Sequence, residues 1–195
     1  ENCPECDTPL IRKEGEAQHF CPNELGCPPQ IKGRIEHFIG RRAMDIEGIG
    51  AETVDALVNL GLIQTAADLY SLTFDEVVKL ERMADKSADN LIKGIEKSKE
   101  NPFEKVLFGI GIRYAGETVA KKLAKRFKSM ENLSKATYDE LVNTDEIGEV
   151  IAISVQNFFL EEKNVAFVNQ LKEAGLKLEI EEKELASAAL EGKIF

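Results

Sequence analysis

A short turn motif recurs four times in this chain, and its period constrains the fold more than any other feature. The motif centres on Gly50, Ala84, Gly116 and Gly148, which are 34, 32 and 32 residues apart. The positions four and seven residues after each centre are apolar: Val54, Leu57, Ala88, Leu91, Ala120, Leu123, Ala152 and Val155. This spacing is typical of one buried helix face, and a period near thirty indicates repeated supersecondary units. Each unit is therefore predicted to be a helix, a tight turn and a second helix, in a mainly α fold.

The four turns are candidate anion sites. The first N–H groups of the helix after each turn lack intrahelical acceptors, and the helix dipole places positive charge there. In the first unit, Gly48 and Gly50 permit unusual backbone angles and remove Cβ atoms that would hold a phosphate away. A helical repeat packed only for its own stability is the alternative. Because basic residues lie beside the turns, we favour binding to a nucleic-acid backbone.

The units differ in how well they suit a phosphate. The third has Arg113 in its turn and several lysines in the helix that follows, whereas the second has Ala84 in place of glycine and the fourth has Glu146 beside its turn. We therefore expect phosphate contact to decrease in the order third, first, second, fourth. The predicted DNA-binding residues are Gly48, Ile49, Gly50, Lys86, Ser87, Arg113, Gly116, Thr118, Lys121, Lys122 and Gly148.

The overall charge argues against a simple cationic DNA-binding surface. The net charge is -10, and affinity for nucleic acids depends largely on neutralisation of phosphates by Lys and Arg. The distribution reduces this objection, since residues 100–128 contain seven basic and three acidic residues, and the acidic excess lies mostly after residue 160. A charged run is usually a solvated helix face, so this asymmetry only supports the DNA-binding hypothesis.

All four cysteines fall within the first thirty residues. Cys3 and Cys6 form a short knuckle, and Cys21 and Cys27 form a looser second pair. Four thiolates in two short loops can surround a structural Zn²⁺, with a hairpin between the pairs returning the chain to Cys21. Disulfides are the alternative, but they suit secreted proteins. His19 is expected to be a surface residue. A closed four-thiolate site would be structural and would not catalyse a reaction.

Patterns of apolar residues and capping signals place the remaining elements. The expected helices cover residues 30–39, 51–60, 65–70, 73–80, 87–98, 102–109, 116–127, 134–142, 149–159 and 164–174, and strands are expected only in the cysteine module and in the last residues. No apolar run approaches the roughly 20 residues needed to span a bilayer. We expect a soluble cytoplasmic protein without membrane contact. Glu1 and Phe195 both suggest a segment cut from a longer chain.

Several motifs together resemble one family. They are the four cysteines, the run from Arg42 to Gly50, the run from Leu80 to Ala88, and Gly111-Ile112-Arg113 followed by Gly116-Glu117-Thr118. In this order they resemble the segment of bacterial NAD-dependent DNA ligases that follows the adenylation domain, over essentially the whole chain. The resemblance implies a zinc finger at 1–29, four helix-hairpin-helix repeats at 30–182, and at 183–195 an acidic linker and the truncated start of a BRCT-like domain.

The resemblance also implies a function. The parent enzyme would transfer AMP from NAD to a lysine and then to a 5′-phosphate, and seal nicks in duplex DNA. The family's catalytic lysine lies in a Lys-x-Asp-Gly motif that this sequence lacks, so we expect no catalytic residue here and NAD bound outside the segment. The segment would grip the backbone of nicked duplex DNA without reading sequence. Its other partners would be the adenylation and oligonucleotide-binding domains of the same monomeric chain.

Two other classes of protein remain as alternatives. Tandem hairpin repeats also suit a non-catalytic, structure-specific DNA-binding or scaffold module of another repair protein. A base-excision glycosylase also uses this hairpin, but it needs an aromatic-lined base pocket, and this chain has no Trp and only three Tyr. The sequence upstream of Glu1 would distinguish the first alternative from a ligase.

Overall fold

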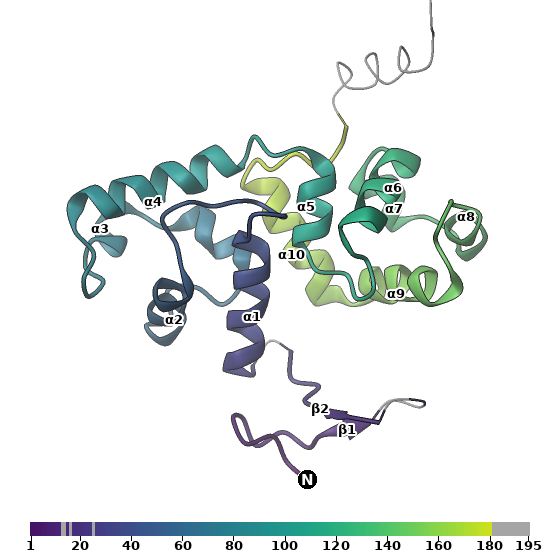
Figure 1. The fold of residues 1–195 in the computed structure, drawn as a ribbon, viewed down its shortest axis with the longest axis horizontal. Helices are drawn as coiled ribbons and strands as arrows, with labels where there is room; N and C mark the ends of the chain where they lie inside the picture. The colour runs from purple at the N-terminus through teal and green to yellow at the C-terminus, as the bar shows by residue number, and fades with distance from the viewer. Residues whose placement is uncertain (13–14, 16, 25, 181–195) are drawn as a thin grey trace, which may run out of the picture.

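The computed structural model describes residues 1–12, 15, 17–24 and 26–180. Figure 1 shows an elongated helical body with a small cysteine module beneath its central helix. Two groups of helices lie on either side of this central helix, which is α1 (Pro28–Ile39). The predicted division into 1–29, 30–182 and 183–195 stays a prediction, and its last part lies outside the described residues. Helix α1 begins two residues before the predicted boundary at residue 30.

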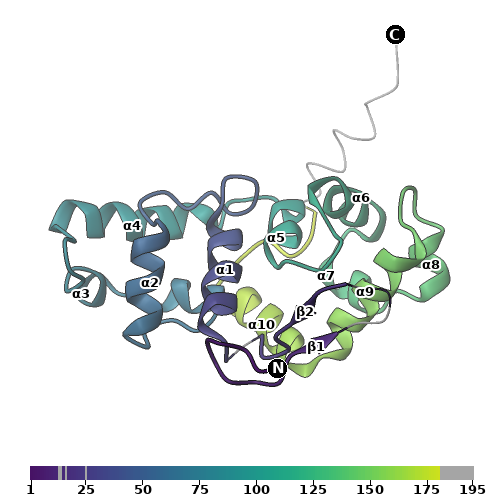
Figure 2. The same cartoon turned by 60° about the horizontal axis from the view of Figure 1, so that its bottom comes forward.

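The cysteine module is built around one short hairpin. Strands β1 (Ile11–Arg12) and β2 (His19–Phe20) pair antiparallel, with Ile11 opposite Phe20 and Arg12 opposite His19. In Figure 2 this hairpin lies in front of helix α9 (Glu149–Leu160). The predicted hairpin between the two cysteine pairs is therefore confirmed.

Helix α1 begins earlier than its apolar pattern indicates. Cys27 is its N-cap, and Pro28 and Pro29 occupy its first two positions. Proline is well tolerated there because those N–H groups have no intrahelical acceptor and the ring fixes a helical φ. The expected start at residue 30 was therefore two residues late.

The first group of helices contains the first two units. It consists of α2 (Ala51–Asn59), the 3₁₀ helix η1 (Ala66–Ser71), α3 (Phe74–Val77) and α4 (Asp85–Ser98). The capping box predicted at Thr73 and Glu76 is present, but α3 is only one turn long, whereas the sequence predicted a helix to residue 80. Helix α4 begins two residues before its expected start.

The second group contains the third and fourth units. It consists of α5 (Phe103–Gly109), α6 (Glu117–Phe127), α7 (Met130–Ser134), α8 (Tyr138–Val142) and α9, and α10 (Glu162–Glu173) then runs between α1 and α5 in the view of Figure 1. The helix predicted over 134–142 was wrong at its start. Helix α8 begins only at Tyr138, after Thr137, which has an extended backbone and forms a capping box with Glu140, and helix α7, which ends at Ser134, was not predicted.

One continuous apolar core joins the two groups. The predicted positions four and seven residues after each turn are at most 1% exposed in all four units. Phe38 of α1 lies at the junction, with edge-to-face ring contacts to Tyr70 and Phe167. The helix-face prediction is therefore confirmed, and α1 is the element that both groups share.

The last described residues fold back onto the second group. Leu178 accepts a hydrogen bond from the backbone of Met130, and Ile180 donates one to Lys128. This return was not predicted, and the strand expected at the end of the chain lies outside the described residues. Within the described part, no helix has the length and apolar character needed to cross a bilayer.

Candidate metal centre and nucleic-acid interface

The structure brings all four predicted metal ligands together. The Sγ atoms of Cys3, Cys6, Cys21 and Cys27 lie within 4.8 Å of one another. The Cys6 and Cys21 sulfurs are 3.4 Å apart and those of Cys3 and Cys27 are 3.9 Å apart. These separations are too long for the roughly 2.05 Å bond of a disulfide. They match the roughly 3.8 Å between thiolates bound tetrahedrally at about 2.3 Å from one ion.

The backbone around the cysteines is arranged for this cluster. The turn after Cys3 is closed by hydrogen bonds from the Asp7 N–H to the Cys3 carbonyl and from the Cys3 N–H to the Thr8 carbonyl. Cys27 caps α1, and the side chain of Gln30 donates to the Cys21 carbonyl at 2.9 Å. A thiolate at Cys27 therefore lies at the positive end of a helix.

The acidity of the thiols differs across the cluster. Hydrogen bonds from the side chain and backbone of Thr8 lower the pKa of Cys6 to about 6. Burial raises the pKa of Cys21 and raises that of Cys27 to about 12. A bound cation favours the thiolate form of all four. His19 is exposed on β2 and is not part of the cluster, as expected.

The four turns have the same backbone geometry. Helices α2, α4, α6 and α9 each begin directly after Gly50, Ala84, Gly116 or Gly148, which have extended backbones, and no side chain caps any of these four helices. Two residues before each N-cap the backbone is left-handed, with φ of 84°, 62°, 64° and 61° at Gly48, Arg82, Tyr114 and Glu146. The repeat inferred from the sequence is therefore a true structural repeat.

Glycine is required by the fold at one position of the turns and not at three others. Gly48 has positive φ, and a Cβ there would lie 3.3 Å from the backbone of Leu91, so the fold itself requires this glycine. Gly50, Gly116 and Gly148 have negative φ, and an added Cβ would meet nothing within 4 Å. Nothing inside the protein requires glycine at these three positions, although side chains such as Ser or Asp are better helix caps.

In the first group, the turn of one unit packs on the second helix of the other. A Cβ added at Gly94 of α4 would lie 2.5 Å from the carbonyl oxygen of Glu47 in the first turn. This close backbone contact fixes the first turn against α4. Sequence reasoning missed Gly94, because nothing in the local pattern of a helix shows which glycine another backbone approaches.

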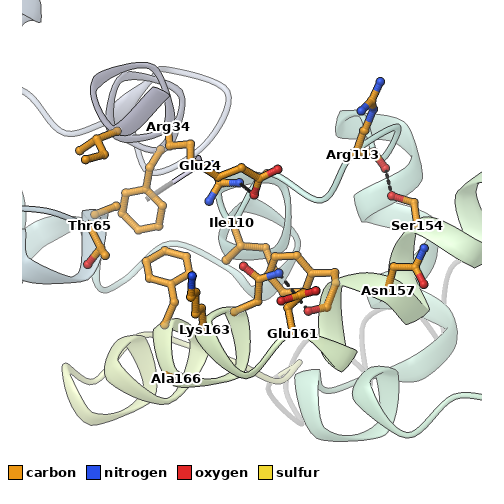
Figure 3. Close-up of a pocket in the computed structure, with 18 of the residues that line it drawn as sticks. Glu24, Arg34, Thr65, Ile110, Arg113, Ser154, Asn157, Glu161, Lys163 and Ala166 are labelled. Atoms are coloured by element: carbon orange, nitrogen blue, oxygen red, sulfur yellow. Dashed lines mark hydrogen bonds and ion pairs between the residues drawn. The ribbon is translucent and has the colours of Figure 1, made fainter. Parts of the chain in front are cut away.

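In the second group, the third turn is held by two other elements. Arg113 lies over the ring of Phe20 from β2, at 5.8 Å, and over the adjacent ring of Tyr114, at 5.0 Å. Its carbonyl accepts a hydrogen bond of 2.6 Å from the Ser154 hydroxyl of α9, which Figure 3 shows as a dashed line. The predicted DNA-binding residue Arg113 is therefore also the contact between the cysteine module and the third turn.

Several basic side chains lie near the start of α6, together with the carboxylates of Glu117 and Glu104. Lys121 forms an ion pair of 2.8 Å with Glu117, which lowers the pKa of Glu117, and the charges of Arg42 and Lys105 contribute in the same direction. Arg42 comes from the loop after α1 and Lys105 from α5. Their location beside the third turn was missed, because it depends on how separate helices pack.

The other predicted residues are mostly exposed at the turns. Lys86, Ser87 and Thr118 are exposed in the first turns of their helices, and Gly48, Gly50, Gly116 and Gly148 are also exposed. Ile49 is only partly accessible and packs against the apolar core. Lys122 does not point away from the protein, because its amino group contacts the fourth turn, where it meets Asp145 and Glu146.

A cavity of about 1090 Å³ lies between the cysteine module, α1, α9 and α10. Figure 3 shows its rim, where Arg34 pairs with Glu24 on one side and Ser154 and Asn157 lie on the other. Its lining mixes apolar side chains of the core with these polar groups. This cavity was not predicted from the sequence.

Comparison with known proteins agrees with this geometry. Residues 2–28 match the family described as the NAD-dependent DNA ligase C4 zinc finger domain. Residues 41–97 match the SAM-like helix-hairpin-helix tandem, and residues 105–168 match the helix-hairpin-helix motif. The predicted fold, a four-cysteine finger followed by tandem helix-hairpin-helix repeats, is therefore confirmed.

Relatives that match over nearly the whole chain are named DNA ligase. The chain is 64% identical to a DNA ligase of Christiangramia forsetii over its full length, and 59% identical to a DNA ligase of Bacteroides fragilis over 95% of its length. A DNA ligase of Azobacteroides pseudotrichonymphae is 44% identical over the full chain. The chain spans only 28 to 30% of the length of these relatives.

Proposed function

Since this chain corresponds to the zinc-finger and helix-hairpin-helix segment of bacterial NAD-dependent DNA ligases, we propose that it holds nicked duplex DNA for such an enzyme. In this proposal the segment contributes no catalytic residue. The parent enzyme binds NAD and becomes adenylated on other domains of the same chain, works as a monomer in the cytoplasm, and seals the nick.

One observation carries the proposal. Gly50, Gly116 and Gly148 stand where the fold would accept a side chain and where a side chain would improve the helix cap. A Cβ or a capping carboxylate there would obstruct only something that approaches from outside. The uncapped N–H groups behind these glycines suit a phosphate oxygen, which gives binding that is independent of base sequence.

The unequal surroundings of the turns support a ranking of their contacts. The third turn lies beside Arg42, Lys105 and Arg113, and the carboxylate of Glu117 next to it is paired with Lys121, whereas the fourth turn carries Asp145 and Glu146. The main grip is therefore the third turn, and the fourth contributes least. The strongest and the weakest turn in this ranking are the same as in the order predicted from the sequence.

DNA titration tests this function. The zinc-loaded chain is titrated with nicked and intact duplexes of two unrelated sequences while the backbone amides of Ala51, Asp85, Glu117 and Glu149 are followed. We expect these signals to shift, with Glu117 shifting most, and affinity to fall steeply with salt but little with sequence. A strong sequence preference, or shifts confined to other surfaces, would contradict the proposal.

The metal in the cysteine cluster is proposed to be one structural Zn²⁺ held by Cys3, Cys6, Cys21 and Cys27. When bound, zinc crosslinks the two knuckles and occupies a site with no open coordination position. Metal analysis of the purified chain should give one zinc per molecule. Chelation should release it and broaden the amide signals of β1, β2 and the first turn of α1, while α4 keeps its signals. Intact signals without metal would refute this role.

A further inference from the structure

The two turns of the second group are held by a reciprocal pair of polar contacts. Ser154 of α9 holds the backbone of the third turn at Arg113, and Lys122 of α6 holds the fourth turn at Asp145. Ser154 and Lys122 occupy the same place in their helices, six residues after the N-cap. Arg113 and Asp145 likewise occupy the same place in their turns, three residues before it. Each helix therefore supplies one side chain, from an equivalent position, that fixes the turn of the other unit.

The contacts of Lys122 leave it little capacity for another anion. Its Nζ donates to a carboxylate oxygen of Asp145 and lies equally close to one of Glu146, at 2.7 Å each. An ammonium has three N–H donors, so two are directed at these partners. The side chain is only 26% exposed, and its hydrogen bonds to both carboxylates raise the pKa of Lys122.

The fourth turn needs such a cation if it is to approach DNA. Asp145 and Glu146 lie in the turn, and Glu149 lies in the first turn of α9 behind it. Three carboxylates at the mouth of a phosphate site would repel the polyanion. Lys122 is the cation that the described contacts place against the two carboxylates of the turn itself.

We propose that Lys122 is a positioning residue, which neutralises and holds the acidic fourth turn so that the Gly148 corner can approach the DNA backbone, and that it does not bind phosphate itself. This inference rests on the proposed function and replaces the direct DNA contact that the sequence predicted for Lys122. Its neighbour Lys121 differs, because Lys121 is 58% exposed and forms its ion pair along its own helix, with Glu117.

A double-mutant cycle separates the two roles. Four zinc-loaded chains are compared for binding to a nicked duplex over a range of salt: the wild type, Lys122→Met, Asp145→Asn with Glu146→Gln, and the triple variant. We expect Lys122→Met alone to weaken binding about five-fold, the effect of a like charge at roughly 4 Å in water. In the background without the two carboxylates, the same change should alter affinity by less than about two-fold and leave the salt slope unchanged.

Direct phosphate contact gives a different result. Lys122→Met would then weaken binding equally in both backgrounds and reduce the salt slope by about 0.9 in each. That outcome, or no effect of Lys122→Met in the wild-type background, would overturn the proposal. If the wild type itself shows no salt-dependent binding to the nicked duplex, the proposed function fails together with this inference.

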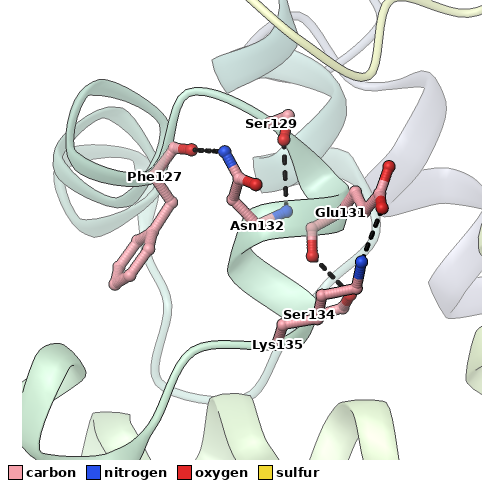
Figure 4. Close-up of polar contacts among 6 residues, drawn as sticks. All are labelled: Phe127, Ser129, Glu131, Asn132, Ser134 and Lys135. Carbon is pink, nitrogen blue, oxygen red and sulfur yellow. Dashed lines mark hydrogen bonds and ion pairs between the residues drawn. The ribbon is translucent and has the colours of Figure 1, made fainter.

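Two further variants control for charge and folding. Lys135→Met removes the same charge from the ion pair with Glu131 in α7, where both partners are 70% exposed (Figure 4). We expect it to change affinity by less than about two-fold. Lys122→Arg keeps the charge and should retain binding. Equal losses for Lys135→Met and Lys122→Met, with both proteins folded by circular dichroism, would show a general charge effect and overturn the proposal.

Discussion

The two groups of helices fix their turns by different means. In the first group, the Glu47 carbonyl lies directly on the backbone of α4 at Gly94, where there is no room for a methyl group. In the second group, the hydroxyl of Ser154 and the ammonium of Lys122 reach the opposite turn. Steric contact between backbones is insensitive to salt and pH, whereas polar contacts at the surface are individually modest and respond to both. The first group therefore provides the more rigid spacing of turns, and the second an adjustable one.

The largest effect is expected from filling the backbone contact of the first group. Gly94→Ala places a Cβ 2.5 Å from the Glu47 carbonyl, so the first turn must move away from α4. We expect the free energy of unfolding to fall by about 2 kcal/mol, as in other overpacked sites. Chemical denaturation measures this loss.

A matched glycine gives the control for this change. Gly33 lies inside α1, and a Cβ there meets nothing within 4 Å. Gly33→Ala should therefore stabilise the protein by about 0.5–1 kcal/mol, because alanine is the better helix former. If Gly94→Ala stabilised the protein as well, the first turn would not be held by contact with α4.

The next largest effect is expected at the three turn glycines where the fold leaves room for a side chain. Gly116→Asp adds a negative charge at the third turn, where nothing lies within 4 Å of the new Cβ. We expect affinity for nicked DNA to fall about ten-fold, while stability stays within about 0.5 kcal/mol. Gly50→Asp should cost less affinity and Gly148→Asp least. Binding isotherms and thermal unfolding are the measurements, and a reversed order would contradict the ranking of the turns.

A smaller effect is expected from the hydroxyl that holds the third turn. Ser154→Ala removes the hydrogen bond to the Arg113 carbonyl and should lower the free energy of unfolding by about 1 kcal/mol. Ser134→Ala is the matched control, since among the described residues the Ser134 hydroxyl donates only to the Glu131 carbonyl within α7 (Figure 4). If both variants unfold at the same denaturant concentration, the contact across the second group contributes nothing.

The smallest effect should be the same in both groups. In the capping boxes, hydrogen bonds from Thr73 and Thr137 lower the pKa of Glu76 and Glu140 below the usual 4.5. A carboxyl with a lowered folded-state pKa stabilises the protein above its unfolded-state pKa, and this stabilisation is lost as pH falls through the folded-state value. Glu76→Gln and Glu140→Gln should each flatten the loss of stability below pH 4.5. Urea titrations at a series of pH values test this, and no flattening for either variant would refute it.

Local signals made most of the fold predictable. The positions four and seven residues after each turn required burial, so their spacing located the four helices that follow the turns. The Thr73 and Glu76 pair is a local capping signal, and it formed as expected. The pair at Thr137 and Glu140 is equally local but lay inside an expected helix, so α8 was predicted to begin at residue 134 and α7 was missed.

Contacts between segments distant in sequence, and the backbone conformations of the turns, could not be predicted from local signals. The backbone at Arg82, Tyr114 and Glu146 is left-handed although none of them is glycine, the residue that usually marks this conformation. The surrounding turn imposes the conformation, so the residue types alone did not reveal it. The ion pairs of Lys122 and the stacking of Arg113 on Phe20 join segments that are distant in sequence. Both residues were predicted as phosphate ligands from their charge and position beside a turn, and these contacts within the protein were not visible in the sequence.

Helix α1 has a consequence for how this protein can be divided. Its N-cap is Cys27 of the four-cysteine cluster, and eleven residues later Phe38 enters the shared core. The cysteine cluster and the repeats are thus connected by a continuous helix and not by a flexible linker. A chain that begins at Gln30 would lose the N-cap and the first two residues of α1. The repeats expressed without the cysteine module would therefore lack part of the helix on which both groups pack.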